Sequence, residues 1–383
     1  MTVTALAIGR LVFGLLLPTM RAELEWSLVQ AGNVGTTVSL GYFALVLPAG
    51  IIASHYGPRI AIIAGLVLIT GSCAALGWVE LYLVVLLVML LMGCGTALLY
   101  TPMIALVVGW FPDRRGTVIG VANSGVGIGV LACGFYVPWL IAENGDAGYR
   151  LAWYSFSLFS LVLLLLVFAL VRNPPADLAA KISSAEKRAE DRKTVLQNTG
   201  IRAIAIVYGI LGVSYIVQSL FMYSYTVESG VSPERAGVMF STMGLLSIFA
   251  GTIWGTLSDY LGRGFALMLN FLVTLSVTAL PVFLPTDTGF MIHYCISGLA
   301  VGGLFTIILA ATSERVEQRL IPVAVSTVTI ALAVGQLIGP IAAGFVIDWS
   351  GSYRPAFIGS SLLMLAGVFF SYRLARVERA GRV

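Results

Sequence analysis

The recurrence of long apolar runs is the feature of this sequence that most restricts its fold. Of the 383 residues, 58% are hydrophobic and 10% are charged, whereas soluble domains carry about 25% charged residues. Runs of about 20 apolar residues recur from end to end, and each is long enough to cross the hydrocarbon of a bilayer as a helix. They predict an all-α membrane protein with spans near residues 2–21, 28–53, 60–78, 82–107, 116–139, 150–171, 201–224, 236–257, 265–284, 290–312, 321–346 and 355–373.

Basic residues predict the orientation of these spans. If both termini are cytoplasmic, only Arg21, Arg150, Arg235 and Arg354 fall in external loops, and the other loop and tail Lys and Arg residues fall inside. Acidic residues divide evenly, so the asymmetry lies in the basic residues alone, as the positive-inside rule expects. We interpret the basic loops as topology determinants and expect no nucleic-acid partner.

The chain divides into two related halves. A charged segment that follows Pro174 and Pro175 separates six spans from six. It predicts an N-terminal bundle (1–172), a cytoplasmic linker (173–200), with or without a short helix, and a C-terminal bundle (201–383). The halves echo each other at an offset of about 204 residues, because Gly57 and Arg59 correspond to Gly262 and Arg263. Parallel repeats of this kind are typical of transporters whose halves rock around a midplane site.

Arg10 is a lone charge inside the first span. A guanidinium in a membrane helix costs about 2.5–3.5 kcal/mol on insertion scales, and it normally faces a polar cavity and meets a partner. It stays protonated, and its fork of donors fits a carboxylate. We interpret Arg10 as the site of an anionic substrate; the alternative is an arginine that reaches the surface or bonds helix carbonyls. One intramembrane cation favours a monovalent anion.

Polar side chains in other spans are the remaining candidates for substrate contacts. Polar groups are costly in lipid unless paired, so they should face the protein interior. The alternative for each is hydrogen bonding between helices. The span-7 set is Tyr208, Tyr215, Gln218 and Ser219, the span-11 set is Ser326, Thr329 and Gln336, and the weaker candidates are Tyr42, Tyr100 and Asn123. Phe13 and Phe305 are expected as apolar walls.

Glycines concentrate in spans 5 and 11, the latter with Gly339-Pro340. Small residues allow helices to approach closely, and Gly or Pro also lets a membrane helix bend. Tight packing and a deformable element both remain open. The span-5 set is Gly120, Gly125, Gly127, Gly129 and Gly134.

No Asp or Glu lies clearly within a predicted span, although proton-coupled carriers commonly use such a group. His293 is the candidate proton site; the alternative is an unremarkable histidine at the membrane interface. Exchange or facilitated diffusion is therefore favoured over proton symport through a carboxylate. The four cysteines show no metal or redox spacing, and neither a phosphate loop nor a catalytic motif is present. We expect no cofactor, no metal and no enzyme activity.

The loop residues resemble the major facilitator superfamily. Gly255-Thr-Leu-Ser-Asp259-Tyr-Leu-Gly262-Arg263 carries the family's Gly-x3-Asp-x2-Gly-Arg signature, and the first copy keeps Gly50, Gly57 and Arg59 but has Ser54 in place of the usual Asp. The resemblance covers the whole chain and implies twelve helices in two six-helix pseudo-repeats. It implies that both loops latch the halves on the cytoplasmic side, more weakly in the first half. It also implies that the polar residues of spans 7 and 11 point into the same cavity as Arg10.

A narrower likeness bears on the substrate. Trp110-Phe111-Pro-Asp-Arg114-Arg115-Gly116 and the glycines that follow resemble the oxalate/formate antiporter and monocarboxylate transporter branch. The first helix, Ile8-Gly9-Arg10-Leu-Val-Phe13, is also similar to that of bacterial facilitators with poorly defined substrates. Both resemblances imply transport, and only the former implies a carboxylate.

We therefore predict a secondary active or facilitative transporter of a small organic anion, such as a monocarboxylate. It would act by rocker-switch alternating access, as a monomeric unit, in the inner membrane of a bacterium. The alternatives are an exporter of amphipathic drugs or metabolites and a non-transporting sensor on a transporter fold. The predicted substrate-binding residues are Arg10, Phe13, Tyr100, Asn123, Tyr215, Gln218, Ser219, Thr329 and Gln336.

Overall fold

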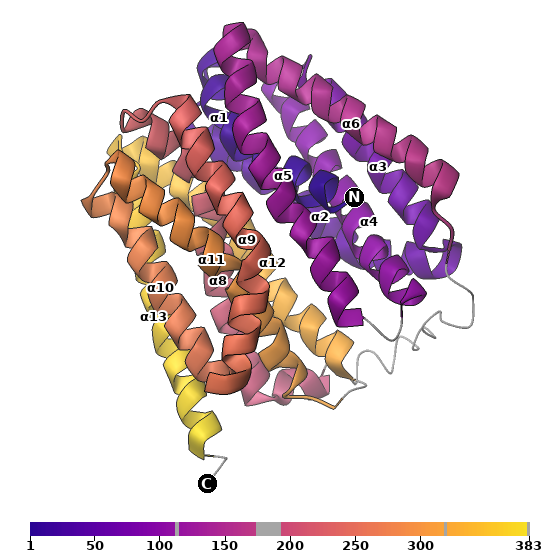
Figure 1. Cartoon of the computed structure of the whole chain (residues 1–383), viewed down its shortest axis with the longest axis vertical. Helices are drawn as coiled ribbons and strands as arrows, with labels where there is room; N and C mark the ends of the chain where they lie inside the picture. The colour runs from indigo at the N-terminus through magenta and orange to yellow at the C-terminus, as the bar shows by residue number, and fades with distance from the viewer. Residues whose placement is uncertain (112–114, 174–192, 318–319, 381–383) are drawn as a thin grey trace. The chain divides into compact units, whose positions relative to one another are not determined.

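The computed structural model describes residues 1–111, 115–173, 193–317 and 320–380 and is built from helices throughout that part of the chain (Figure 1). Twelve helices in the described residues are long and apolar enough to cross a membrane. This confirms the predicted all-α membrane fold. The predicted linker falls mainly in 174–192, outside the described residues.

The helices follow one another through short connections. The first six spans are η1 (Val3–Leu11) continued by α1 (Val12–Glu23), α2 (Leu28–Tyr56), α3 (Pro58–Leu76), α4 (Tyr82–Trp110), α5 (Arg115–Asn144) and α6 (Gly148–Leu170). The last six are α8 (Thr199–Glu228), α9 (Pro233–Leu261), α10 (Arg263–Phe283), α11 (Asp287–Ser313), α12 (Ile321–Ser350) and α13 (Arg354–Ala380). Many helices extend past the predicted runs, because their end turns carry polar residues that an apolar count omits.

Local sequence signals set several helix ends. Ser27 and Gln30 form a capping box at the start of α2: the Ser27 Oγ accepts from the Gln30 backbone N–H at 3.1 Å, and the Gln30 side chain accepts from the Ser27 N–H at 2.9 Å. Such reciprocal bonds satisfy two donors that a helix start otherwise leaves unpaired. Thr286 caps α11 by accepting from the Gly289 N–H. These caps fix where α2 and α11 begin.

The first span departs from the single regular helix that the sequence predicts. Residues Val3–Leu11 form a π-helix, in which the Val12 backbone N–H donates to the Ala7 carbonyl, five residues back. A π turn is wider than an α turn and occurs frequently at functional sites. Arg10 lies in the last turn of this segment.

The chain packs as two compact units. Unit 1 comprises Met1–Ile182 with Met222–Ile248, and unit 2 comprises Ser183–Phe221 with Phe249–Val383. The helices α8 and α9 therefore each contribute residues to both units. The predicted boundary between bundles at 173–200 is a division by sequence repeat and stays a prediction.

Close contact between α5 and the unit 1 part of α9 explains several span-5 glycines. A Cβ at Gly134 or Gly127 would lie 2.8 Å or less from the α9 carbonyl oxygens of Gly237 and Gly244. The hydroxyl of Ser241 donates to the Leu131 carbonyl across the same contact at 2.9 Å. Small residues thus let two helix backbones meet. Packing accounts for these glycines, and their part in any motion stays a prediction.

Candidate functional site

The Arg10 side chain is half-buried in unit 1 and lies over the aromatic ring of Tyr42 on α2. The guanidinium carbon is 4.7 Å from the ring centroid, within the range of a cation–π interaction. The preceding residue, Gly9, packs against α4, where a Cβ would lie 2.4 Å from the Thr96 methyl carbon. Arg10 is therefore held on α4 through its neighbour and on α2 through Tyr42.

The backbone at Tyr42 on α2 is also held against α4 through glycines. A Cβ at Gly41 would lie 2.1 Å from the Leu90 carbonyl oxygen of α4, and a Cβ at Gly93 would lie 2.9 Å from the Tyr42 backbone nitrogen. Only glycine at these positions lets α2 and α4 approach so closely. The Tyr42 side chain therefore extends from a part of α2 whose backbone is in direct contact with the backbone of α4.

A second polar pair lies in the same unit. The Tyr100 hydroxyl of α4 donates to the Asn123 side-chain oxygen of α5 at 2.8 Å. Asn123 is exposed, and because its oxygen accepts from Tyr100, its amide N–H groups are directed to other partners. The structure thus pairs Arg10 with Tyr42 and Tyr100 with Asn123 within unit 1. Phe13, the predicted wall, is only 3% exposed and belongs to the packed interior.

Unit 2 brings the Tyr208 and Tyr215 rings of α8 against Phe305 of α11. The ring centroids lie 5.9 Å and 5.4 Å from that of Phe305, both edge to face, an arrangement that aromatic quadrupoles favour. Phe305, predicted as an apolar wall, is half-buried in this group.

The other predicted polar residues of unit 2 bond within the protein. The Gln218 amide donates to the Thr278 hydroxyl of α10 at 2.9 Å. Ser219 and Thr329 donate to the carbonyls of Ile216 and Val325 on their own helices. Gln336 is 5% exposed. These bonds are the interhelical or local pairing that the sequence left open, and substrate contact by these residues stays a prediction.

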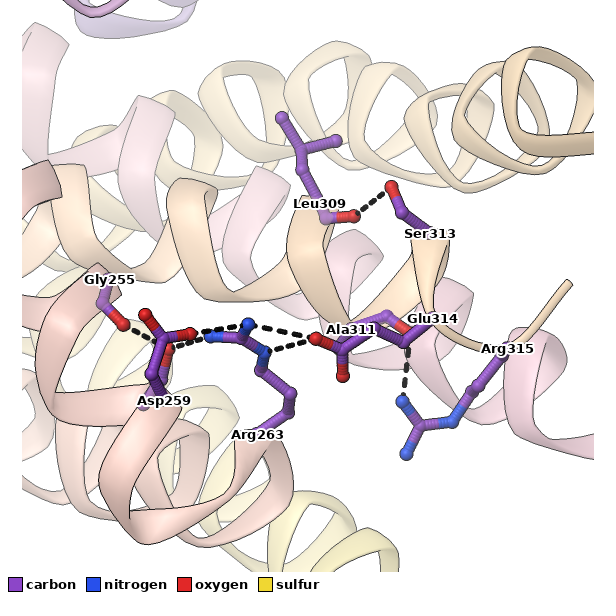
Figure 2. Close-up of polar contacts among 9 residues, drawn as sticks. Gly255, Asp259, Arg263, Leu309, Ala311, Ser313, Glu314 and Arg315 are labelled. Carbon is purple, nitrogen blue, oxygen red and sulfur yellow. Dashed lines mark hydrogen bonds and ion pairs between the residues drawn. The ribbon is translucent and has the colours of Figure 1, made fainter. Parts of the chain in front are cut away.

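The second copy of the loop signature forms an ionic cluster at the junction of α9, α10 and α11 (Figure 2). The guanidinium of Arg263 lies 2.6 Å from an Asp259 carboxylate oxygen and 2.8 Å from one of Glu314. It also donates to the Ser258 hydroxyl. The cluster joins the ends of three helices of unit 2. Glu314 was not predicted, since it lies about 50 residues from Arg263 in the sequence.

The first copy makes neutral contacts instead. Arg59 donates from its guanidinium to the Phe168 carbonyl at 2.6 Å and lies over the Phe168 ring. Its backbone N–H donates to the Asn173 side-chain oxygen at 2.9 Å. A Cβ at Gly57 would collide with the Asn173 amide, whereas Gly50 faces open space and Gly255 makes ordinary contact with Thr306. The predicted latch between the halves stays a prediction.

Comparison with known proteins supplies the family. The family model described as "Uncharacterised MFS-type transporter YbfB" matches residues 2–371. The chain belongs to this family of major facilitator transporters. The monocarboxylate transporter 12 of Mus musculus is 28% identical over 326 residues, which cover 76% of this chain and 66% of that protein. The hexuronate transporter of Bacillus subtilis (strain 168) is 22% identical over 94% of this chain and 89% of that protein.

The solved structures agree on the fold. The bacterial homologue of the human lysosomal transporter Spinster, in an inward-facing and unoccupied conformation, superposes with a TM-score of 0.82 at 16% identity over 98% of this chain and 95% of that one. The family model thus confirms the resemblance to the major facilitator superfamily, and the solved structure agrees with its fold.

His293 is buried in this transporter, at 2% exposure, with its Nδ1 2.7 Å from the Val277 carbonyl of α10. Asn270, Thr274 and Thr278 lie nearby in sequence on α10 and are fully buried. Thr274 donates to Asn270, and Thr278 accepts from Gln218. Sequence reasoning missed this ladder, although its four-residue spacing in an apolar span was a usable signal. A proton role for His293 stays a prediction.

No group of three or more His, Cys, Asp or Glu side chains that could hold a metal ion occurs among the described residues of the transporter. The two pairs of candidate side chains in unit 1 comprise a guanidinium, two phenols and an amide.

Proposed function

We propose that this major facilitator protein transports a small organic anion with a single carboxylate, and that Arg10 binds that carboxylate. The observation that carries the proposal is the Arg10 guanidinium, half-buried in a π-helical turn over the Tyr42 ring. A guanidinium is a permanent cation with a fork of donors, and a substrate carboxylate would meet it with paired hydrogen bonds.

The relatives support the same substrate chemistry. The mouse and Bacillus subtilis proteins are named for monocarboxylates and hexuronate, and both names denote molecules with one carboxylate. A second carboxylate would leave an uncompensated charge in a site of low dielectric. Asn123 adds amide donors for a further substrate oxygen. Substrate contact by Tyr215, Thr329 and Gln336 stays a prediction.

Alternating access is the mechanism we propose, in a bacterial inner membrane with both termini cytoplasmic and a monomer as the functional unit. The fold is the one on which other transporters of the superfamily are built. Exchange or facilitated diffusion fits the predicted spans, which hold no clear carboxylate for proton coupling.

The test is uptake of labelled lactate, pyruvate, formate and oxalate into proteoliposomes. Arg10→Gln should lower the kcat/KM for the transported anion about 100-fold or more, because it leaves a carboxylate in the site without its counter-charge. Arg376→Gln is the matched control, since Arg376 also lies over a tyrosine ring, that of Tyr372, at 5.4 Å, but is exposed on α13. It should leave uptake unchanged.

The arms of this experiment separate the alternatives. Acceleration by an internal counter-anion identifies exchange, and acceleration by an inward proton gradient identifies symport. Normal affinity in the Arg10→Gln protein contradicts the role of Arg10. Broad inhibition that is insensitive to substrate charge indicates an exporter of amphipathic compounds, and binding without any flux indicates a sensor.

A further inference from the structure

We propose that Tyr42 is a positioning residue that holds the Arg10 guanidinium in the orientation in which it meets the substrate carboxylate. The inference rests on the proposed anion transport and adds a residue that sequence reasoning ranked low. It depends on the 4.7 Å contact between the Arg10 guanidinium carbon and the Tyr42 ring.

The support for this ring is rigid. Tyr42 follows Gly41, and Arg10 follows Gly9, and each glycine brings its helix onto α4. Gly93 of α4 closes the contact from the other side, next to the Tyr42 backbone nitrogen. Because adjacent glycines anchor both residues to one helix, the backbone positions from which the ring and the guanidinium extend keep a fixed relation.

The chemistry of the contact suits a binding residue. An arginine side chain has many rotamers, and ordering it before the substrate binds improves affinity. The Tyr42 ring attracts the cation through its π face and consumes none of its N–H donors. The ring therefore orients Arg10 without competing with an anion for the donors. A carboxylate in place of Tyr42 would neutralise Arg10 and occupy its donors.

The π-helical turn adds a second, independent constraint. The extra residue per turn changes the direction in which following side chains leave the helix, and Arg10 lies at the end of that segment. Tyr42 then defines the end point of a side chain whose start is set by the wide turn. The π-helical turn thus sets where the Arg10 side chain begins, and the Tyr42 ring sets where its guanidinium lies.

The experiment compares Tyr42→Leu and Tyr42→Phe with the unmodified protein by initial-rate uptake in proteoliposomes. Tyr42→Leu removes the ring and should raise the KM for the anion about tenfold while Vmax stays within about twofold. Tyr42→Phe keeps the ring and should restore the original KM. The matched control is Tyr372→Leu, which removes the ring of the exposed pair with Arg376 and should change neither parameter.

The other outcomes are decisive as well. An unchanged KM in the Tyr42→Leu protein overturns the inference while Arg10→Gln still tests the proposed function separately. A fall in Vmax and thermal stability without a rise in KM assigns Tyr42 to packing and overturns it. Failure of Tyr42→Phe to restore KM assigns the effect to the hydroxyl and overturns it. If the unmodified protein shows no Arg10-dependent anion uptake, the proposed function falls and this inference falls with it.

Discussion

The two copies of the loop signature share the backbone conformation of their glycine but differ in the charge of the groups that their arginine contacts. Gly57 and Gly262 both have φ 85° and ψ 148°, so the chain leaves one helix and enters the next in the same way. Arg59 then meets a carbonyl, a ring and the Asn173 amide, whereas Arg263 meets two carboxylates. An arginine that matches in an alignment therefore need not have a matching partner.

A single inserted residue contributes to the difference. Arg263 is the first residue of α10, but Pro58 precedes Arg59 at the start of α3, so Arg59 is the second residue of its helix. One residue rotates a side chain by about 100° around a helix axis. Arg59 is thereby directed to the end of α6, and Arg263 to the ends of α9 and α11. A cation is unfavourable at a helix start, and only the second copy compensates it with carboxylates in the described part of the chain.

The largest loss of stability in this comparison is expected when Gly57 or Gly262 is replaced by alanine. The backbone of Gly57 and Gly262 lies in a region that is essentially restricted to glycine, and strain there costs about 1–3 kcal/mol. Gly57→Ala and Gly262→Ala should therefore both destabilise, and Gly57→Ala should in addition displace the Asn173 side chain, which a Cβ at Gly57 would strike. Thermal unfolding in detergent measures both, with Gly50→Ala as the control, since Gly50 faces open space. A loss from either substitution no larger than that from Gly50→Ala would contradict the backbone strain at these glycines.

An intermediate loss of stability is expected from removing the positive charge of Arg263 in the second copy. Arg263→Gln breaks contacts with Asp259 and Glu314, whose side chains are 62% and 54% exposed, so solvent screening limits the loss to about 1 kcal/mol. Raising the salt concentration should narrow the difference in melting temperature from the unmodified protein.

Arg59→Gln is the contrasting variant for the first copy. Its recorded partners in the described structure are neutral, and its buried Nε lacks a hydrogen-bond partner there. The loss of stability should be smaller than for Arg263→Gln and should not change with salt. If both variants respond equally to salt, the electrostatic distinction between the copies is wrong.

The sequence predicts the parts of this fold that depend on composition and local pattern. The twelve spans, the short joint before α4 and both arginine loops are recoverable, because apolar length and glycine–arginine spacing are local properties. Arg10 stands out for the same reason, since a charge in an apolar run is visible without any structure. Its π-helical turn is not visible in that way, because no residue pattern distinguishes it from an α-helix.

Partners across helices are what the sequence leaves undetermined. Tyr42 and Arg10 are about 30 residues apart, and their contact depends on how α2 and η1 rotate against α4. Gln218 was predicted for the substrate and bonds to Thr278, because a polar stripe shows that a residue faces inward but not what it meets. Rotational setting comes from packing over the whole helix, which single-sequence periodicity does not encode.

The smallest loss of stability is expected at Asn173. In the first copy this side chain meets the start of α3, whereas in the second copy carboxylates meet the arginine at the start of α10. The Asn173 side-chain oxygen accepts from the Arg59 backbone N–H, one of the donors that the start of α3 leaves unpaired. Asn173 is exposed, so Asn173→Ala should cost only about 0.5 kcal/mol. Asn173→Asp should keep the bond and add a favourable charge at the helix start.

Combining Asn173→Ala with Gly57→Ala isolates the cost of the collision between a Cβ at Gly57 and the Asn173 side chain. Gly57→Ala should cost less in the Asn173→Ala protein than in the unmodified one, because the side chain that the new Cβ would strike has gone, while the backbone strain remains. Melting temperatures of the four proteins in detergent complete this cycle. Additive losses would show that Asn173 yields freely to a Cβ at Gly57, and the first copy would then differ from the second in charge alone.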